Sequence, residues 1–228
     1  MDLETRKEQL DQRVNTAARR VNREPEEITL LAVSKKQTAE VIRELAATGQ
    51  QSFGENYLQE AIDKIKQLAK LGLEWHFIGQ IQRNKTTAVS ENFDWAQSVD
   101  RLIIAERLSA QRPENMAKLN VCIQVRMSKE AGKGGVSKEE LFPLAEAIDA
   151  LPGVILRGLM TIPENTTDKD KQRMAFREMH GLYKKLKAQY NTVDTLSMGM
   201  TGDFELAIEE GSTMIRVGTA LFGPRIYT

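Results

Sequence analysis

A lysine at the end of an apolar run is the first residue in this sequence whose position suggests chemistry. Lys35 directly follows Leu30–Ser34, and this is unusual because lysine is rarely buried without a partner. Desolvation lowers the pKa of an amine, and a neutral amine attacks a carbonyl carbon to form a Schiff base. Alternation along a strand puts Lys35 and Lys36 on opposite faces, but parity does not show which face lines the inside of the fold. A turn with two solvated lysines is the alternative.

Two glycine-containing loops near the C-terminus predict an anion-binding site. Ser197–Asp203 runs from a strand end to a helix start. Its glycines let backbone N–H groups approach an anion, and its hydroxyls add further donors. Arg216–Thr219 follows the next apolar run and supplies a cation and another glycine. In parallel barrels the loops after the last two strands often bind phosphate. Plain turns, in which the glycines serve only the backbone, are the alternative.

Other reactive residues give weaker signals. His76 lies inside the apolar segment Glu74–Gly79, where a core histidine without chemistry is the alternative to a site residue. Asn56, Arg126 and Met160 also stand at predicted strand ends. The chain has two histidines and one cysteine, and they lack the spacing of metal ligands. We therefore predict no metal site.

The apolar pattern predicts a scaffold that brings these strand ends together. Short runs rich in Val, Ile and Leu alternate with longer segments of helical periodicity. The predicted strands are Ile28–Ser34, Ser52–Asn56, Glu74–Gly79, Asp94–Val99, Leu119–Val125, Val154–Met160, Thr195–Met200 and Met214–Phe222. The predicted helices cover about residues 3–22, 38–49, 56–71, 82–91, 101–111, 138–150, 169–189 and 203–210. Near-continuous apolar strands that alternate with helices favour parallel pairing in an α/β fold.

Eight such strands favour a (β/α)₈ barrel with an extra N-terminal helix, and a doubly wound open sheet of fewer strands is the competing architecture. The strand Asp94–Val99 carries the weakest pattern. Ser137 and Glu140 have capping-box spacing and predict a helix start. Pro143 falls inside that helix, so we expect a break there, with the main helix starting near the proline.

Composition limits the classes of function. The chain has 228 residues, and 32 Lys plus Arg balance 32 Asp plus Glu. A general nucleic-acid binder, which carries a basic excess, is therefore not expected. No stretch approaches the ~20 apolar residues of a membrane span, and the N-terminus lacks the apolar run of a secretory signal. The single Cys122 fits a reducing compartment. We expect one cytoplasmic domain over residues 1–228, with neither nucleic acid nor membrane as a partner.

Short blocks spread from about Ile28 to the C-terminus resemble one known family. The blocks are Leu31–Lys35, Phe53–Tyr57, Trp75–Gly79, Gln82–Lys85, Arg157–Met160, Leu196–Met200 and Arg216–Gly223. Their order and spacing make the chain similar to the pyridoxal phosphate homeostasis proteins. The resemblance implies a barrel like the N-terminal domain of alanine racemase, with pyridoxal 5′-phosphate (PLP) as the cofactor.

The same resemblance implies roles for particular residues. Lys35 would carry PLP as a Schiff base. Arg216 would face the pyridine nitrogen, and Asn56 and His76 would lie near the ring. The residues implied to hold the phosphate are Ser197, Gly199, Gly218 and Thr219.

Two functions of different classes follow from this resemblance. The first is a non-catalytic carrier that buffers intracellular PLP and delivers it to PLP-dependent apoenzymes. The second is an amino-acid racemase, which needs an acid or base on each face of the ring. In the resembling racemases the second base is a tyrosine from another domain and a partner subunit. This chain ends at Thr228, so we expect that domain to be absent, which favours a monomeric carrier. A third hypothesis, from the motifs alone, is a phosphosugar-binding barrel enzyme, which would use the phosphate loops but leave Lys35 without a purpose.

Overall fold

Eight parallel strands close into a barrel in the computed structural model, which describes residues 2–127, 134–164 and 166–223. The strands follow one another around the barrel in sequence order, and β1 pairs with β8 to close it. Their bounds are β1 Thr29–Val33, β2 Ser52–Glu55, β3 Glu74–Phe77, β4 Trp95–Val99, β5 Leu119–Gln124, β6 Val154–Met160, β7 Thr195–Ser197 and β8 Met214–Val217. The predicted (β/α)₈ barrel is confirmed, and its closure excludes the open sheet.

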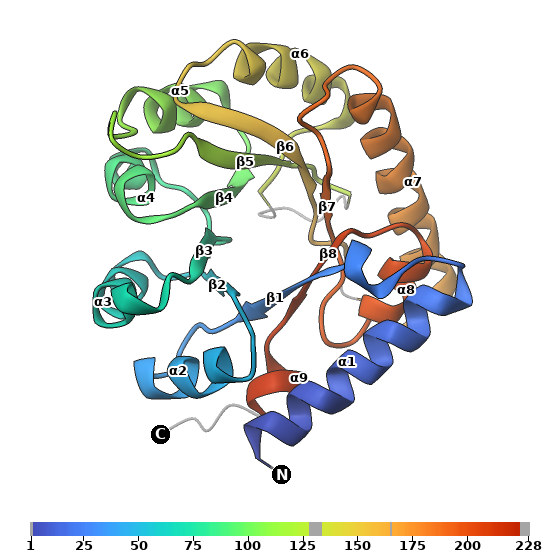
Figure 1. The fold of residues 1–228 in the computed structure, drawn as a ribbon. Helices are drawn as coiled ribbons and strands as arrows, with labels where there is room; N and C mark the ends of the chain where they lie inside the picture. Colours follow the sequence, from blue (N-terminus) through green and yellow to red (C-terminus); the bar gives the residue numbers. More distant parts are fainter. Residues whose placement is uncertain (1, 128–133, 165, 224–228) are drawn as a thin grey trace.

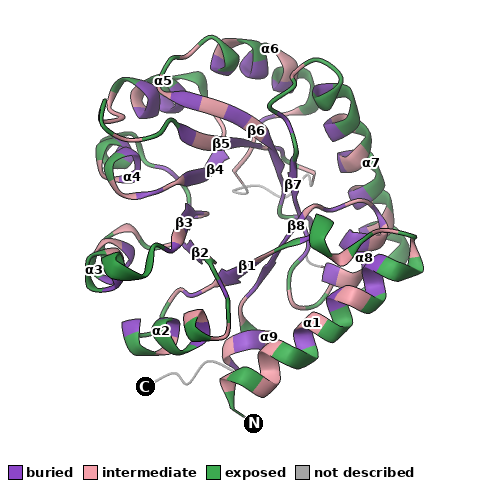
Figure 2. Ribbon diagram, viewed as in Figure 1, coloured by how far each residue is buried: buried purple, intermediate pink, exposed green. Residues whose placement is uncertain are grey.

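Helices surround the ring of strands (Figure 1). They are α1 Leu3–Arg20, α2 Ala39–Ala47, α3 Leu58–Leu68, α4 Thr86–Asn92, α5 Leu102–Ala110, α6 Lys138–Asp149, α7 Lys169–Lys187, α8 Phe204–Glu209 and α9 Thr219–Phe222. Figure 2 shows buried strands and helices that are exposed on their outer sides. In α1 the buried Leu10, Val14 and Ala17 recur at helical spacing, and this stripe packs against α8 and α9. Within the described ranges, no helix is both long enough and apolar enough to cross a membrane.

Two strands end three or more residues before the predicted end. β7 stops at Ser197, because the chain then turns through Gly199 at φ +95°. β8 stops at Val217, so the predicted strand Met214–Phe222 is wrong in its second half. The apolar residues after Gly218 form α9 instead. A side chain at Gly218 would bring Cβ to 3.3 Å from the Val33 carbonyl oxygen, which shows how closely this turn approaches β1.

The predicted break at Pro143 is also wrong. Helix α6 runs unbroken from Lys138 to Asp149, and its start is fixed by the predicted capping box of Ser137 and Glu140. Pro143 lies on the exposed outer side of the helix. Its missing N–H leaves unpaired only the carbonyl of Glu139, which stands in the exposed first turn and is open to water.

The apolar core lies mostly between the strands and the helices, while the inside of the barrel is smaller and more polar. Trp95, Cys122 and Met160 form a separate buried cluster contributed by β4, β5 and β6. His76 of β3 stacks on Trp95, with ring centroids 5.0 Å apart. Polar side chains therefore share the interior layers with apolar ones, and the carboxyl ends of the strands lie above them.

Candidate functional site

A cavity of about 260 Å³ opens at the carboxyl ends of the strands. It is lined by Val33, Lys35, Asn56, Ile78, Ile162, Met200, Thr201, Gly202, Arg216, Gly218 and Thr219. Five residues that the sequence singled out therefore meet in one place, namely Lys35, Asn56, Arg216, Gly218 and Thr219. They come from the ends of β1, β2 and β8, which the closure of the barrel brings side by side. Arg126 and Met160, the weaker candidates, do not line this cavity.

The turn after β1 fixes the half-buried Lys35 from both sides. Ser34 before it is fully buried, and its carbonyl oxygen accepts a hydrogen bond from Lys64 Nζ at 2.8 Å. Lys36 after it adopts φ +63°, a left-handed conformation, and its backbone N–H donates to Glu60 Oε1 at 2.5 Å. The backbone that carries Lys35 is thus anchored to α3, and the lysine side chain faces the cavity.

A buried ion pair behind this turn escaped the sequence analysis. Lys64 Nζ lies 2.8 Å from Glu55 Oε1, with 6% and 0% of the two side chains exposed. Ser34 Oγ donates to the same carboxylate oxygen at 2.6 Å. Burial raises the pKa of Glu55 against the attraction of Lys64. The signal was present, because Lys64 falls on the buried stripe of α3 between Ala61 and Leu68.

Arg216 brings a buried positive charge to the cavity. Only 4% of the residue is exposed, and its guanidinium donates to Ser197 Oγ and to the Thr161 carbonyl oxygen, each at 2.8 Å. Within the described ranges no carboxylate forms an ion pair with it. Burial lowers the pKa of Arg216 to about 10, which leaves it charged at neutral pH. A buried cation without a carboxylate partner favours an anionic or electron-rich ligand.

Asn56 contributes an unsatisfied acceptor. Its side-chain oxygen Oδ1 is buried and has no hydrogen-bond partner among the described residues. Buried polar atoms are nearly always paired, so an exception calls for an explanation. Because Asn56 lines the cavity, a ligand with a hydrogen-bond donor would satisfy it.

The two glycine-containing loops, Ser197–Asp203 and Arg216–Thr219, form another part of the cavity wall. Gly199 has φ +95°, and a Cβ there would lie 2.6 Å from Ala207 Cβ, so this position requires glycine. Its carbonyl oxygen accepts the backbone N–H of Arg216 at 2.9 Å, which ties the two loops together. Gly218 and Thr219 stand where α9 begins, and the first N–H groups of a helix have no acceptor within it. This wall can offer backbone and hydroxyl donors to an anion.

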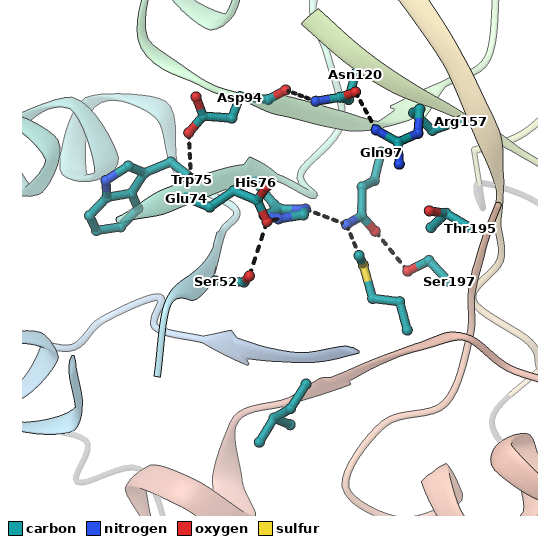
Figure 3. A network of polar contacts seen from close by, with 12 residues as sticks. Ser52, Glu74, Trp75, His76, Asp94, Gln97, Asn120, Arg157, Thr195 and Ser197 are labelled. Carbon is teal, nitrogen blue, oxygen red and sulfur yellow. Dashed lines mark hydrogen bonds and ion pairs between the residues drawn. The ribbon is translucent and has the colours of Figure 1, made fainter. Parts of the chain in front are cut away.

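Three of the predicted residues do not line the cavity. His76 and Ser197 are fully buried inside the barrel, and Gly199 is buried within its turn. His76 Nε2 lies 2.8 Å from Glu74 Oε1, and Ser197 Oγ donates to Gln97 Oε1 at 2.7 Å (Figure 3). Burial lowers the pKa of His76. No group of three or more metal-ligating side chains occurs in the part of the chain that the structure describes.

Comparison with known sequences gives one consistent result. The family model described as alanine racemase, N-terminal domain, matches residues 6–225. A protein of Vibrio cholerae named pyridoxal phosphate homeostasis protein is 49% identical over 97% of this chain and 95% of its own length. A protein of the same name from Pseudomonas aeruginosa is 52% identical over 94% of this chain and 92% of its own.

Solved structures agree with the sequence comparison. PipY of Synechococcus elongatus, solved with PLP bound, has a TM-score of 0.83 at 36% identity and covers 97% of this chain and 100% of its own. Alanine racemase from Corynebacterium glutamicum has a TM-score of 0.65 at 20% identity. That match covers 94% of this chain but 60% of the racemase, and it shows likeness of fold alone.

Proposed function

The chain belongs to the pyridoxal phosphate homeostasis protein family, built on the alanine racemase N-terminal domain, and we propose that it binds PLP at Lys35 and serves the homeostasis of this cofactor. The observation that carries the proposal is the convergence of Lys35, Asn56, Arg216, Gly218 and Thr219 on one cavity. The relatives that bear the family name match nearly the whole chain. PipY, a homologue at 36% identity, holds PLP in its solved structure.

The donor set of the cavity fits the chemical groups of PLP. An amine for the aldehyde comes from Lys35, and a buried cation for the electron-rich ring comes from Arg216. The unsatisfied Oδ1 of Asn56 accepts a ligand hydroxyl. The volume of about 260 Å³ is slightly below the usual range of ligand pockets, about 300–1,000 Å³. A single substituted ring is a suitable occupant.

When bound, PLP supplies an aldehyde that captures an amine and a ring that withdraws electrons. Lys35 Nζ would supply the amine that holds this aldehyde. The anchored turn holds the lysine backbone in place, so only its side chain has to adjust. A covalent bond that water reverses suits a protein that stores a cofactor and gives it up again.

We assign Arg216 to the ring nitrogen and the two glycine loops to the phosphate. A guanidinium donates hydrogen bonds only, so it disfavours a protonated ring nitrogen and weakens electron withdrawal by the ring. Holding PLP is then favoured over carbanion chemistry. Gly218 and Thr219 line the cavity and support the phosphate assignment directly. Ser197 and Gly199, which the resemblance also implied for the phosphate, do not line the cavity and instead accept hydrogen bonds from Arg216.

We further propose that the protein is a non-catalytic carrier that delivers PLP to apoenzymes. We propose that it is a monomer in which residues 1–228 form one domain. A racemase is the second candidate because of the shared fold. It needs a base on each face of the ring, and no tyrosine stands among the residues that line the cavity. The nearest in sequence, Tyr57, is half exposed and precedes α3. His76, which the resemblance implied near the ring, is buried and does not line the cavity.

The test is the visible absorption spectrum of the purified protein, followed by borohydride reduction and peptide mass spectrometry. We expect a cofactor band in the wild type, its loss in Lys35→Ala, and a reduced adduct on the Lys35 peptide. Lys36→Ala is the matched control and keeps the band, since Lys36 is exposed. An adduct elsewhere with a normal band in Lys35→Ala would refute the lysine assignment. Exchange of the α-hydrogen of amino acids for deuterium would favour the racemase.

A further inference from the structure

A chain of hydrogen bonds crosses the inside of the barrel (Figure 3). Gln97 of β4 is its centre: Nε2 lies 2.8 Å from His76 Nδ1 of β3, and Oε1 accepts from Ser197 Oγ of β7 at 2.7 Å. Strands β4 and β7 are not neighbours in the sheet, so the bond between Gln97 and Ser197 spans the interior. Arg216 of β8 then donates to Ser197 Oγ at 2.8 Å. At most 4% of any of these four residues is exposed.

The chemistry of the donors fixes the direction of this chain. Arg216 has donors only, so Ser197 Oγ accepts from it and sends its own proton to Gln97 Oε1. The amide N–H of Gln97 then faces His76 Nδ1, which must be an unprotonated acceptor. His76 Nε2 carries the proton and donates to Glu74 Oε1 at 2.8 Å. The tautomer of His76 thus follows from the network.

A neutral His76 is required for this arrangement, and burial lowers the pKa of the ring. A protonated ring would present a donor to the Gln97 amide and force the amide to flip. The flipped amide would donate to Ser197 Oγ, so the Ser197 hydroxyl would lose Gln97 Oε1 as its acceptor and would have to rotate, and the lone pair that faces Arg216 would move with it. The state of a side chain on β3 therefore bears on the hydrogen bonding of an arginine on β8.

The geometry points to Gln97 and His76 as positioning residues that hold Arg216 toward the cofactor. Gln97 Oε1 accepts the hydroxyl proton of Ser197 and so fixes the rotation of that hydroxyl, which points a lone pair of Oγ at the guanidinium. Thr161 contributes the second anchor through its carbonyl oxygen, at 2.8 Å. With both anchors in place Arg216 is fixed at the floor of the cavity. This inference rests on the proposed function, in which Arg216 faces the ring nitrogen of PLP.

A pair of glutamine variants separates positioning from simple stability. Gln97→Leu removes the link to Ser197 and His76. Gln50→Leu is the matched control, because Gln50 is 5% exposed and donates two hydrogen bonds to Leu30 and Ser52, neither of which is a hydrogen-bond partner of Arg216. We expect Gln97→Leu to weaken PLP binding about tenfold, the equivalent of one lost charge-assisted hydrogen bond, and to move the visible band of bound PLP. Gln50→Leu should stay within about twofold of the wild type.

The outcomes keep this inference apart from the proposed function. A wild type that binds no PLP would refute the proposed function. A wild type that binds PLP, together with Gln97→Leu of unchanged affinity and unchanged band, would overturn the positioning role alone. If Gln97→Leu fails to fold, ¹⁵N NMR of the unmodified protein decides. It has two histidines, and His76 should carry a proton on Nε2 and none on Nδ1 at pH 8, since burial lowers the pKa of its ring. A proton on Nδ1 would contradict the network.

Discussion

Removing the buried cation behind the Lys35 turn should destabilise the protein in a way that depends on pH. In Lys64→Met, Glu55 keeps its hydrogen bond from Ser34 but loses the ammonium 2.8 Å away. Its second oxygen, Oε2, is already buried without a partner. The variant therefore holds an uncompensated carboxylate inside the protein, and that is the costliest way to break a buried ion pair.

The expected loss is about 3–5 kcal/mol in the free energy of unfolding at neutral pH. Water screens the attraction between the two charges very little, because 6% of the Lys64 side chain and none of the Glu55 side chain is exposed. For a chain of this length about 1 kcal/mol corresponds to about 2 °C, so the melting temperature should fall by about 6–10 °C. Lys66→Met, on the exposed side of the same helix, should change stability by less than about 0.5 kcal/mol.

The sign of the pH dependence follows from the raised pKa of Glu55 in the folded protein. A carboxyl whose pKa rises on folding stabilises the protein fully below its unfolded pKa, about 4.3, and this stabilisation is lost as pH rises through the folded value. Without Lys64 the folded pKa lies higher still, so the deficit of Lys64→Met should grow between pH 5 and pH 8. Chemical unfolding at both pH values measures it.

A double variant provides the control for this prediction. Glu55→Gln in the Lys64→Met background removes the buried charge and should recover most of the lost stability, because the amide oxygen still accepts from Ser34 Oγ. The reasoning is wrong if the double variant is no more stable than Lys64→Met, or if the deficit of the single variant is equal at pH 5 and pH 8.

Three further predictions concern the backbone and the single thiol. Gly199→Ala should lower the free energy of unfolding by about 2–4 kcal/mol, because the residue has a positive φ and its Cβ would contact Ala207. Gly202→Ala, with open space around the residue, should be near neutral, and equal effects of the two substitutions would contradict this prediction. Pro143→Ala should stabilise the protein by about 1 kcal/mol, since it restores a helical hydrogen bond at an exposed site, and a lower melting temperature would argue against that. Cys122 is fully buried and burial raises the pKa of its thiol, so a disulfide reagent at pH 8 should label it only after denaturation.

The fold was predictable because strands buried on both faces appear as continuous apolar runs. Even the weakest of them, Asp94–Val99, corresponds to β4 at Trp95–Val99. The same rule failed at β8, where the apolar run continues past the last residue of the strand. The residues after Gly218 are as apolar as β8, yet they face the core from α9, and only the backbone geometry at the glycine marks the change.

The site was predictable in the part that strand ends define. Lys35, Asn56 and Arg216 stand at such ends, and the closed barrel brings them to one cavity. The support beneath them was not predictable. Gln97 lies mid-strand, and its role depends on its partner on β7, 100 positions further along the chain. A single sequence carries no sign of such a pairing across the barrel.

The sequence alone could not show whether Lys35 or Lys36 faces the cavity, because that depends on contacts between the β1 turn and α3. Alternation leaves the two lysines equivalent, because a one-residue slip of β1 exchanges their faces. The contacts with α3 remove this symmetry. Glu60 binds the backbone N–H of Lys36, which turns the chain at φ +63°, while Lys64 binds the carbonyl of Ser34 from the same helix. Helix α3 therefore places Lys35 at the cavity, and a one-residue slip of β1 would break both hydrogen bonds together with the bond from Ser34 Oγ to Glu55.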